Sequence, residues 1–262
     1  MTAQENTHAT SIVDPKAHLS EFTSVGPYSI IESNVNIGSN CQIDSHVLIG
    51  WGTTIGDDCN IHKGAVVGTI PQDLKFKGED SELIVGDRTV IREYATLNRG
   101  TLPGEAKTIV GEDCLLMAYS HIAHDCILGD QVIIANAVQL AGHIEIDSYS
   151  SVGGLTAIHQ FVKIGQSSFI GGRARVPQDV PPFILASGEP LNYYGPNAVG
   201  LRRRGFSRDQ ISNIKKAYSY IYSDKLNLTQ ATEAIKSEME ISSEINVIFD
   251  FLERSNRGLI NG

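Results

Sequence analysis

The sequence has few cysteines, a single tryptophan and no long apolar run. No stretch approaches the roughly 18 apolar residues of a membrane-spanning helix, and the polar N-terminal ten residues lack the regions of a secretory signal. The 21 Lys and Arg are outnumbered by 30 Asp and Glu, and the resulting net charge of −9 argues against general nucleic-acid binding. Four cysteines without CxxC or zinc-ribbon spacing indicate a reduced, cytoplasmic chain.

What the sequence does have is a repeat of six residues. Hexads cover residues 10–69, 82–99 and 107–178, and the fourth residue is aliphatic in all 25 of them, beginning with Val13. Ordinary amphipathic strands would show period two broken by turns, so an unbroken period of six is specific. The second residue is small or β-branched throughout the first block, and all four cysteines occupy this position. We interpret them as small interior residues.

Hexads of this kind predict a parallel β-helix, in which each hexad is a short strand plus a corner and three hexads complete one coil. Residues 18 apart then become vertical neighbours, separated by roughly 4.8 Å. The aliphatic fourth residues point inward, where each buried side chain contributes roughly 1.5–3 kcal/mol.

The repeat is interrupted twice and then ends. Residues 70–81 place acidic residues where aliphatic ones should fall, and residues 100–106 shift the register by one. Such loops on a rigid scaffold commonly carry function. We expect the β-helix domain to span residues 1–189 and a helical domain to span 190–262. Within the latter, Ser207 and Gln210 form a plausible capping box, with further helices over 229–239 and 243–254.

Because residues 18 apart are vertical neighbours, polar side chains from the hexads of residues 107–178 come together near one corner of the predicted prism. A histidine in such a cluster can serve as a general base, and a neighbouring carboxylate can orient its ring. The same imidazoles could instead ligate zinc. The gathered residues are His121, His124, Asp125, Gly142, His143, His159 and Gln160.

A second candidate is a basic stretch in an otherwise acidic chain, containing Arg202, Arg203, Arg204 and Arg208. It is either a solvated helix face or a site for phosphate or an acidic partner, because guanidinium groups match phosphate oxygens.

Several strings resemble one family closely: GTIPQDLKFKGE (68–79), LLMAYSHIAHDC (115–126), AIHQF (157–161) and GLRRRGFSR (200–208). They look like the UDP-N-acetylglucosamine O-acyltransferases of lipid A biosynthesis, and the resemblance covers nearly the whole chain. It implies a left-handed β-helix, a handedness that the periodicity alone does not give. It also implies transfer of an (R)-3-hydroxyacyl group from acyl carrier protein to the 3-hydroxyl of UDP-N-acetylglucosamine.

By the same resemblance, His124 is the general base, Asp125 orients it, and the N–H of Gly142 stabilises the oxyanion. No metal is implied, and the only prosthetic group is the phosphopantetheine arm of the acyl carrier protein. Gly172 matches the acyl-length ruler, which favours a longer hydroxyacyl chain. The implied substrate-binding residues are Gln72, Asp73, Lys75, His121, His143, His159, Gln160, Gly172, Asn197, Arg203 and Arg204.

The chain departs from the family pattern at Arg173, Pro190 and Val199, which leaves the acyl length and one nucleotide contact open. An amine acceptor in place of the hydroxyl also stays open. Two other functions compete: a zinc hydratase of the carbonic-anhydrase type, and a solenoid that only presents a binding surface. The flat prism sides favour a homotrimer with sites between subunits.

Overall fold

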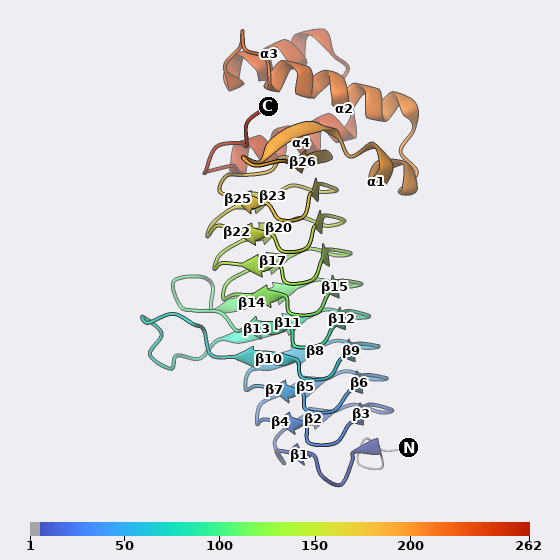
Figure 1. Cartoon of the computed structure of the whole chain (residues 1–262), viewed down its shortest axis with the longest axis vertical. Helices are drawn as coiled ribbons and strands as arrows, with labels where there is room; N and C mark the ends of the chain where they lie inside the picture. The colour runs from blue at the N-terminus through green and yellow to red at the C-terminus, as the bar shows by residue number, and fades with distance from the viewer. Residues whose placement is uncertain (1–5) are drawn as a thin grey trace.

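The structure of the protein is a computed structural model, and residues 6–262 are described. Its coils stack into a tall three-sided prism, two loops project from one side, and the C-terminal helices sit at one end (Figure 1). No helix in the described part of the chain is long and apolar enough to cross a membrane. The expected architecture, a left-handed parallel β-helix of hexapeptide repeats followed by C-terminal helices, is confirmed.

Three sheets form the faces of the prism, and they are parallel from β1 to β26 because consecutive strands in that range belong to different sheets. The first face consists of β1 (Ile12–Val13), β4 (Ile30–Ile31), β7 (Leu48–Ile49), β10 (Val66–Thr69), β13 (Thr96–Asn98), β16 (His121–Ile122), β19 (Gln139–Leu140), β22 (Ala157–Ile158) and β25 (Arg175–Val176). The second face consists of β2 (His18–Leu19), β5 (Asn36–Ile37), β8 (Thr53–Ile55), β11 (Glu82–Val85), β14 (Lys107–Val110), β17 (Ile127–Leu128), β20 (Glu145–Ile146) and β23 (Lys163–Ile164). The third face consists of β3 (Ser24–Val25), β6 (Gln42–Ile43), β9 (Asn60–Ile61), β12 (Val90–Ile91), β15 (Leu115–Leu116), β18 (Ile133–Ile134), β21 (Ser151–Val152), β24 (Phe169–Ile170), β26 (Ile184–Ser187) and β27 (Asn192–Pro196), the last pairing antiparallel.

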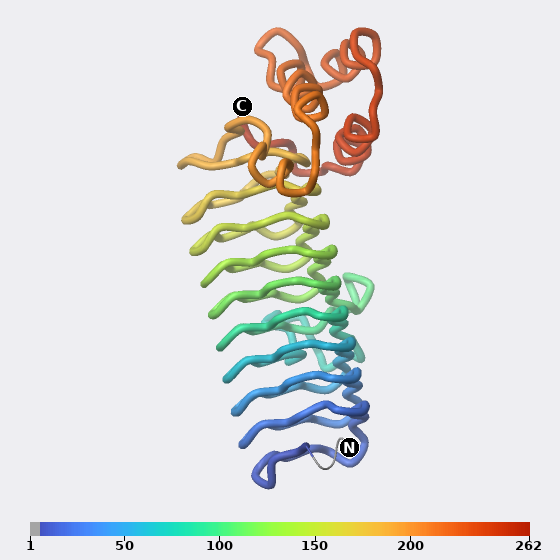
Figure 2. Tube along the Cα trace, turned by 90° about the vertical axis from the view of Figure 1, so that its right-hand side faces the viewer, coloured from blue at the N-terminus to red at the C-terminus, as the bar shows by residue number. Residues whose placement is uncertain are grey.

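Successive coils pair at the predicted spacing of 18 residues, so the coils are evenly stacked (Figure 2). His121 pairs with Gln139, and Gln139 pairs with Ala157. The two loops lengthen the spacing without breaking the ladder, because Val66 pairs with Thr96 and Thr96 pairs with His121. The insertions therefore leave the prism wall while the fourth hexad residues stay in register.

The corners of the prism rest on an unusual backbone conformation. The first residue of most hexads has a positive φ, as at Asp125 (60°) and His143 (59°), although non-glycine residues rarely adopt it. Hydrogen bonds between coils compensate: the N–H of His143 donates to the carbonyl of His124, and that of Phe161 donates to Gly142. Each corner is thereby fixed by the coil before it.

The interior follows the hexad pattern. Ile122, Leu140 and Ile158, all fourth residues, are at most 3% exposed. The four cysteines are free and buried, as the sequence predicts. Cys126 donates its S–H to the carbonyl of Ala141, and burial raises the pKa of this thiol to about 12. These thiols are packing groups.

Four helices follow the strands: α1 (Ala198–Arg203), α2 (Arg208–Ile221), α3 (Leu228–Glu238) and α4 (Ser243–Arg254). The predicted capping box of Ser207 and Gln210 is present at the start of α2, and the two later helices lie where the sequence places them. The short helix α1 lies within the helical domain expected over 190–262, although the sequence does not distinguish it as a separate helix. The boundary expected at residue 189 lies in the turn between β26 and β27.

Polar contacts fix the helical region to the prism. Arg254 at the end of α4 pairs with Glu145 and Asp147 on the second face. The fully buried Asp179 accepts hydrogen bonds from the hydroxyl of Ser255 and from the N–H groups of residues 256 and 257. The C-terminal segment is therefore bound to the last coil through one carboxylate.

Candidate active site

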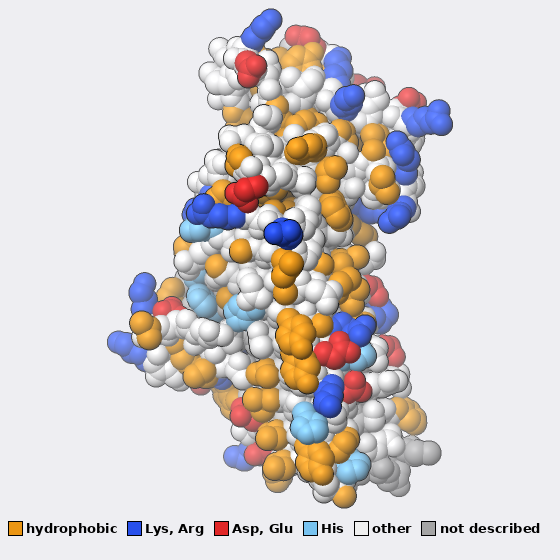
Figure 3. Space-filling model, in the orientation of Figure 1, with side chains coloured by type: hydrophobic (Ala, Val, Ile, Leu, Met, Phe, Trp, Pro, Cys, Tyr) orange, Lys and Arg blue, Asp and Glu red, His pale blue; other side chains and the backbone are white. Residues whose placement is uncertain are grey.

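Both loops and the predicted histidine cluster lie at one edge of the prism. We call this corner, between the first and second faces, the His124 edge. The first loop connects β10 to β11 and the second connects β13 to β14, so both leave the wall between the same two faces as His124, which follows β16. Histidine side chains gather beside the projecting loops on the surface (Figure 3). The fold thus brings together segments separated by about 90 residues in the sequence.

His124, Asp125 and His143 form a compact cluster at this edge. Nδ1 of His124 lies 2.7 Å from Oδ2 of Asp125, and Nε2 of His143 lies 3.5 Å from the same oxygen. The two imidazole rings meet edge to face, with centroids 5.2 Å apart. The side chains are only 12%, 3% and 19% exposed, respectively. One carboxylate therefore faces two imidazoles in a largely water-free setting.

The second loop holds Asp125 in place. The N–H of Thr101 donates to Oδ1 of Asp125 at 2.8 Å, and the Thr101 hydroxyl donates to Oδ2 at 2.6 Å. The hydroxyl of Thr108 accepts the N–H of Asp125. Burial raises the pKa of the Asp125 carboxyl, but hydrogen bonds from His124 and Thr101 outweigh burial, and the net pKa is lowered. Asp125 is a carboxylate at neutral pH, oriented by donors on both oxygens.

Gly142 lies against the His124 ring, one coil later. A Cβ at this position would come within 2.6 Å of Cε1 and 2.8 Å of Nε2, so any side chain would displace the imidazole. No group within residues 6–262 accepts a hydrogen bond from the N–H of Gly142. A backbone donor and the Nε2 side of His124 thus flank the same small space.

Two neighbouring histidines are held in the neutral form. Burial lowers the pKa of His121, assisted by His124, and the His121 Nδ1 lies 2.7 Å from the hydroxyl of Thr96. Burial also lowers the pKa of His143, while the carboxylates of Asp125 and Asp73 oppose this effect. The influence of Asp73 places the first loop within electrostatic reach of the cluster.

Other predicted residues of this edge lie further from the cluster. His159 is exposed, and its Nδ1 contacts the carbonyl of Gln160. It stands one position before the column of His124 and Gly142, above Ala141, so its ring is not stacked on those of His124 and His143. Gln72 and Lys75 are exposed in the first loop. These residues lie around the His124 edge, outside the cluster of His124, Asp125 and His143.

The third group of predicted residues lies on the opposite side of the same chain. Asn197, Arg203 and Arg204 line a groove of about 710 Å³ on the third face, whose other walls include Met117 and Phe169. The third face is the side of the triangle that does not meet the His124 edge. One chain therefore carries two separate groups of predicted site residues.

Two residues of this groove are held by local contacts. Asn197 caps α1 by accepting the N–H of Gly200, and its amide donates to the carbonyl of Ser167. The Arg204 guanidinium lies 3.5 Å from the centroid of Tyr149, contacts the Ser167 hydroxyl, and has a pKa lowered by burial. Arg203 is exposed. Gly172 lies apart from the groove walls, at the corner between the third and first faces.

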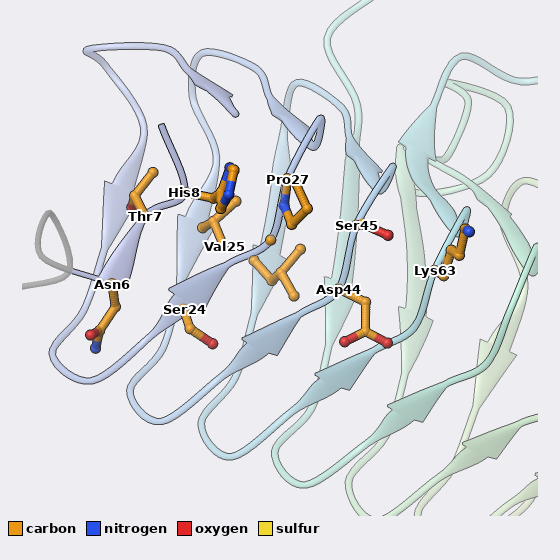
Figure 4. A pocket seen from close by; sticks show the side chains of 11 residues that line it. Asn6, Thr7, His8, Ser24, Val25, Pro27, Asp44, Ser45 and Lys63 are labelled. Carbon is orange, nitrogen blue, oxygen red and sulfur yellow. The ribbon is translucent and has the colours of Figure 1, made fainter. Parts of the chain in front are cut away.

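Further hollows do not gather comparable chemistry. A small pocket of about 280 Å³ continues from Asp125 and His143 onto the second face, where Lys163 pairs with Glu145. A larger hollow of about 700 Å³ near the N-terminal end is lined by residues from several coils, as the labelled side chains show (Figure 4). Its polar groups are spread along the third face without a converging acid and base.

Among residues 6–262, His124, Asp125 and His143 are the group whose potential metal-ligand atoms converge, all within 4.8 Å. Nδ1 of His124 is hydrogen-bonded to Oδ2 of Asp125, whereas Nε2 of His143 lies at ion-pair distance, 3.5 Å, from the same oxygen. The cluster is therefore built as a hydrogen-bonded acid–base system.

The sequence did not reveal Thr101 and Thr108, which hold Asp125, or Gly104, which packs against its carboxyl group. The only sequence feature that pointed to this segment is the one-residue shift of the hexad register at residues 100–106. Its meaning depends on where the loop folds back, which periodicity cannot show.

The chain is similar to known proteins over nearly its whole length. Residues 179–260 match the family model of UDP-N-acetylglucosamine O-acyltransferase domain 2, and residues 107–142 match the bacterial transferase hexapeptide model. An acyl-[acyl-carrier-protein]–UDP-N-acetylglucosamine O-acyltransferase of Thermodesulfovibrio yellowstonii is 44% identical over 252 residues, covering 96% of this chain and 98% of the relative. The corresponding protein of Herminiimonas arsenicoxydans is also 44% identical, over 257 residues, with 97% and 98% coverage.

Solved structures agree as well. LpxA from Acinetobacter baumannii superposes with a TM-score of 0.95 at 43% identity, covering 98% of this chain and 100% of that one. LpxA from Bacteroides fragilis gives a TM-score of 0.95 at 42% identity, covering 97% and 99%. The fold and the histidine–carboxylate site define a hexapeptide-repeat acyltransferase. Within that class, the chain belongs to the UDP-N-acetylglucosamine O-acyltransferase family, and the match does not support a zinc hydratase.

Proposed function

We propose that this protein transfers an (R)-3-hydroxyacyl group from acyl carrier protein to the 3-hydroxyl of UDP-N-acetylglucosamine, the first step of lipid A biosynthesis. Family membership supports the reaction class and the two substrates. The observation that carries the mechanism is the His124–Asp125 pair facing the unused N–H of Gly142.

In the proposed mechanism, His124 acts through Nε2. Asp125 binds Nδ1–H, so the unprotonated Nε2 accepts the proton of the sugar hydroxyl as its oxygen attacks the thioester carbonyl. The C–O bond forms, and the carbonyl electron pair moves onto oxygen as an oxyanion. The N–H of Gly142 stabilises this charge, a contribution of about 2.7–4 kcal/mol for one such donor.

Collapse of the intermediate completes the transfer. The oxyanion re-forms the carbonyl, the C–S bond breaks, and the imidazolium returns its proton to the departing thiolate of the carrier arm. Asp125 stays ionised and stabilises the imidazolium, in keeping with its lowered pKa. The residues of the chain account for every proton moved, and we propose no cofactor beyond the phosphopantetheine arm on the donor.

The separation of the His124 edge from the groove of the third face supports a homotrimer. The His124 edge of one chain and the groove of the third face lie on opposite sides, so a second copy is needed to bring Arg203 toward His124. A closed ring of three prisms, edge against face, repeats this contact three times. The mostly apolar groove, with arginines at one end, fits an acyl chain attached to a phosphate-bearing arm.

We place the reaction in the cytoplasm, because four free thiols suit a reducing compartment. The exposed Arg202 and Arg203 offer a basic surface for the carrier protein beside the groove. We expect the third face to set the length of the acyl chain that is transferred. On or near this face lie Gly172, Pro190 and Val199.

The test is mass analysis of the product formed by the purified chain from UDP-N-acetylglucosamine and a set of hydroxyacyl carrier proteins. We expect an ester whose mass matches a longer hydroxyacyl group, and the 3-amino sugar nucleotide serves as a competing acceptor. Absence of transfer from every donor would refute the proposal. Preference for short donors would refute the chain-length expectation alone, and preference for the amine would change the acceptor.

A further inference from the structure

The first loop, residues 70–81, is tied to the prism by the residues that end β13. The amide of Asn98 donates to the hydroxyl of Thr69 at 3.1 Å and to the carbonyl of Ile70 at 3.0 Å. The N–H of Arg99 donates to the carbonyl of Thr69. Because Asn98 is only 3% exposed, these bonds fix the start of the loop from inside.

The Arg99 side chain reaches the middle of the loop. Its guanidinium carbon lies 4.9 Å from the centroid of Trp51 and 5.5 Å from that of Phe76, which belongs to the loop. One guanidinium nitrogen also donates to the carbonyl of Trp51 at 3.4 Å. A single cation therefore bridges a ring on the prism and a ring on the loop, a geometry within the range of cation–π attraction.

This arginine is unusual for its lack of an anionic partner. Arg99 is 9% exposed, no ion pair joins it to any residue in 6–262, and its Nε has no acceptor there. Burial lowers its pKa, while Glu32, Asp80 and Glu79 oppose that effect from a distance. A buried arginine stabilised mainly by two aromatic rings and one carbonyl is costly to desolvate, which points to a positional role.

The loop has few other anchors. Leu74 is fully exposed, and the loop's charged side chains lie mostly in solvent. Phe76, by contrast, is half-buried, and its N–H donates to the carbonyl of Asp73. The turn that places the Phe76 ring on Arg99 therefore also sets the position of Asp73, whose charge acts on His143.

Arg99 and His124 occupy the same place in the repeat. Each is the sixth residue of its hexad, in YATLNR and YSHIAH, and their strands β13 and β16 are neighbours on the first face. The anchoring point therefore lies one coil from the proposed general base.

We propose that Arg99, with Asn98, Trp51 and Phe76, forms a clamp that holds the first loop against the His124 edge and so positions Asp73 for the sugar-nucleotide acceptor. This role as a positioning residue rests on the proposed function. The clamp itself does not, because loop attachment can be measured without any substrate.

The first experiment measures attachment by limited trypsin digestion of the full-length protein. Lys75 and Lys77 lie in the exposed loop, and cleavage after them reports the fraction of time that the loop is released. We expect Arg99→Lys and Phe76→Leu to be cut at these sites about ten times faster than the unmodified protein. Phe76→Tyr, which keeps the ring, and Arg92→Lys, an exposed arginine on the same coil, should be cut at the original rate.

The second experiment separates KM from kcat. We expect Arg99→Lys and Phe76→Leu to raise KM for the sugar nucleotide about tenfold with kcat changed less than threefold, because His124 and Asp125 are untouched. The pKa of His143, followed by NMR, should fall in both variants as Asp73 moves away. The control variant Phe76→Tyr should keep the KM for the sugar nucleotide and the pKa of His143 at the values of the unmodified protein.

The outcomes distinguish the two ideas. Unchanged loop cleavage and an unchanged His143 pKa in both variants would overturn the clamp, even in an active enzyme. A uniform loss of melting temperature and activity, with no faster cleavage at Lys75 or Lys77, would also overturn it, because that pattern marks a general packing role. If the unmodified protein shows no transfer at all, the proposed function fails while the digestion experiment still decides the clamp.

Discussion

Two edges of the prism are built from the same hexad corners but differ in what the side chains do. The corner between the second and third faces, which we call the Asp130 edge, uses sixth-position side chains to accept N–H groups from the sixth residue one coil earlier. Asp130 accepts the N–H of Glu112, and Ser148 accepts that of Asp130. The series of these accepting residues is Asp57, Asp87, Asp130 and Ser148.

At the His124 edge the equivalent position is treated differently. The sixth residue after β19 is Gly142, and no side chain of the described chain covers its N–H. The preceding coil supplies His124, whose ring occupies the space that a side chain on residue 142 would need. What distinguishes this position is that residue 142 has no side chain and that the His124 ring lies against it, so a free backbone donor and an imidazole share one small space.

The largest effect is expected from removing the base at the His124 edge. His124→Ala should lower kcat by about 10³-fold, within the usual range for general acid–base catalysis, because no other unpaired imidazole faces Gly142. Steady-state transfer assays measure this loss. His46→Ala, an exposed histidine at the corner between the third and first faces, should leave activity unchanged. Near-normal activity of His124→Ala would show that the two edges do not differ in chemistry.

A smaller loss is expected from covering the uncovered donor. Gly142→Ala forces a Cβ to within 2.6 Å of the His124 ring, so the base must move and the N–H is crowded; we expect about a 10²-fold fall in kcat. The matched change at the Asp130 edge is Gly129→Ala, whose Cβ would come within 2.5 Å of the Ser148 hydroxyl. That variant should melt earlier but keep its activity per folded molecule. Equal kinetic losses in the two variants would contradict the assignment.

The two edges should also respond differently to acid. At the His124 edge burial lowers the pKa of His121 and His143 below 6.5, so the unfolded chain binds more protons as pH falls through that value. Stability is therefore complete above pH 6.5 and declines below it. At the Asp130 edge the pKa of Asp113 is lowered from 3.8 by Arg88, so its contribution is lost only below about pH 4.

Thermal melts between pH 7.5 and 5 measure this difference. We expect the melting temperature to fall by a few degrees over that range, and His121→Gln to reduce the slope. An Asp113→Asn variant should keep the original slope above pH 5. If His121→Gln leaves the slope unchanged, the neutral imidazole at this position is not the source of the acid sensitivity.

The smallest effect is expected at the Asp130 edge itself. Asp130→Ala removes the acceptor of the Glu112 N–H at an exposed corner, and we expect a loss of about 0.5–1 kcal/mol in the free energy of unfolding. The transfer rate should not change. A matched fall in activity would mean that this edge also belongs to the catalytic apparatus.

Much of the fold could be read from the sequence because the hexad is a local rule. The fourth-position residues, the buried cysteines and the capping box at Ser207 each depend on side chains a few residues apart. The stacking of Gly142 and His143 on His124 followed from the same arithmetic, whereas the roles of Asp125 and of the Gly142 N–H came from the family resemblance. The helix α1 was expected only as part of the helical domain, because six residues carry too little periodicity to identify a separate helix.

What the arithmetic missed depends on parts of the chain without a repeat. Thr101 binds Asp125 from a loop whose path no period describes, and Arg99 clamps another such loop through Phe76. The 18-residue interval already places His159 one position before the column, but it does not give the direction of the exposed ring, because a single position is enough to turn a side chain on a strand. The placement of Arg203 opposite the His124 edge required knowing which face continues into the helices.

The sequence alone thus determined the prism, its interior and the column of residues along each edge, because vertical stacking converts an 18-residue interval into a contact. Only the tertiary structure decided that the His124 ring lies against Gly142, which loop side chains hold the Asp125 carboxylate, and that the groove of the third face lies away from the His124 edge. The physical reason is that these features depend on the direction in which a side chain or loop leaves the wall, and a repeat of six specifies distance along the wall alone.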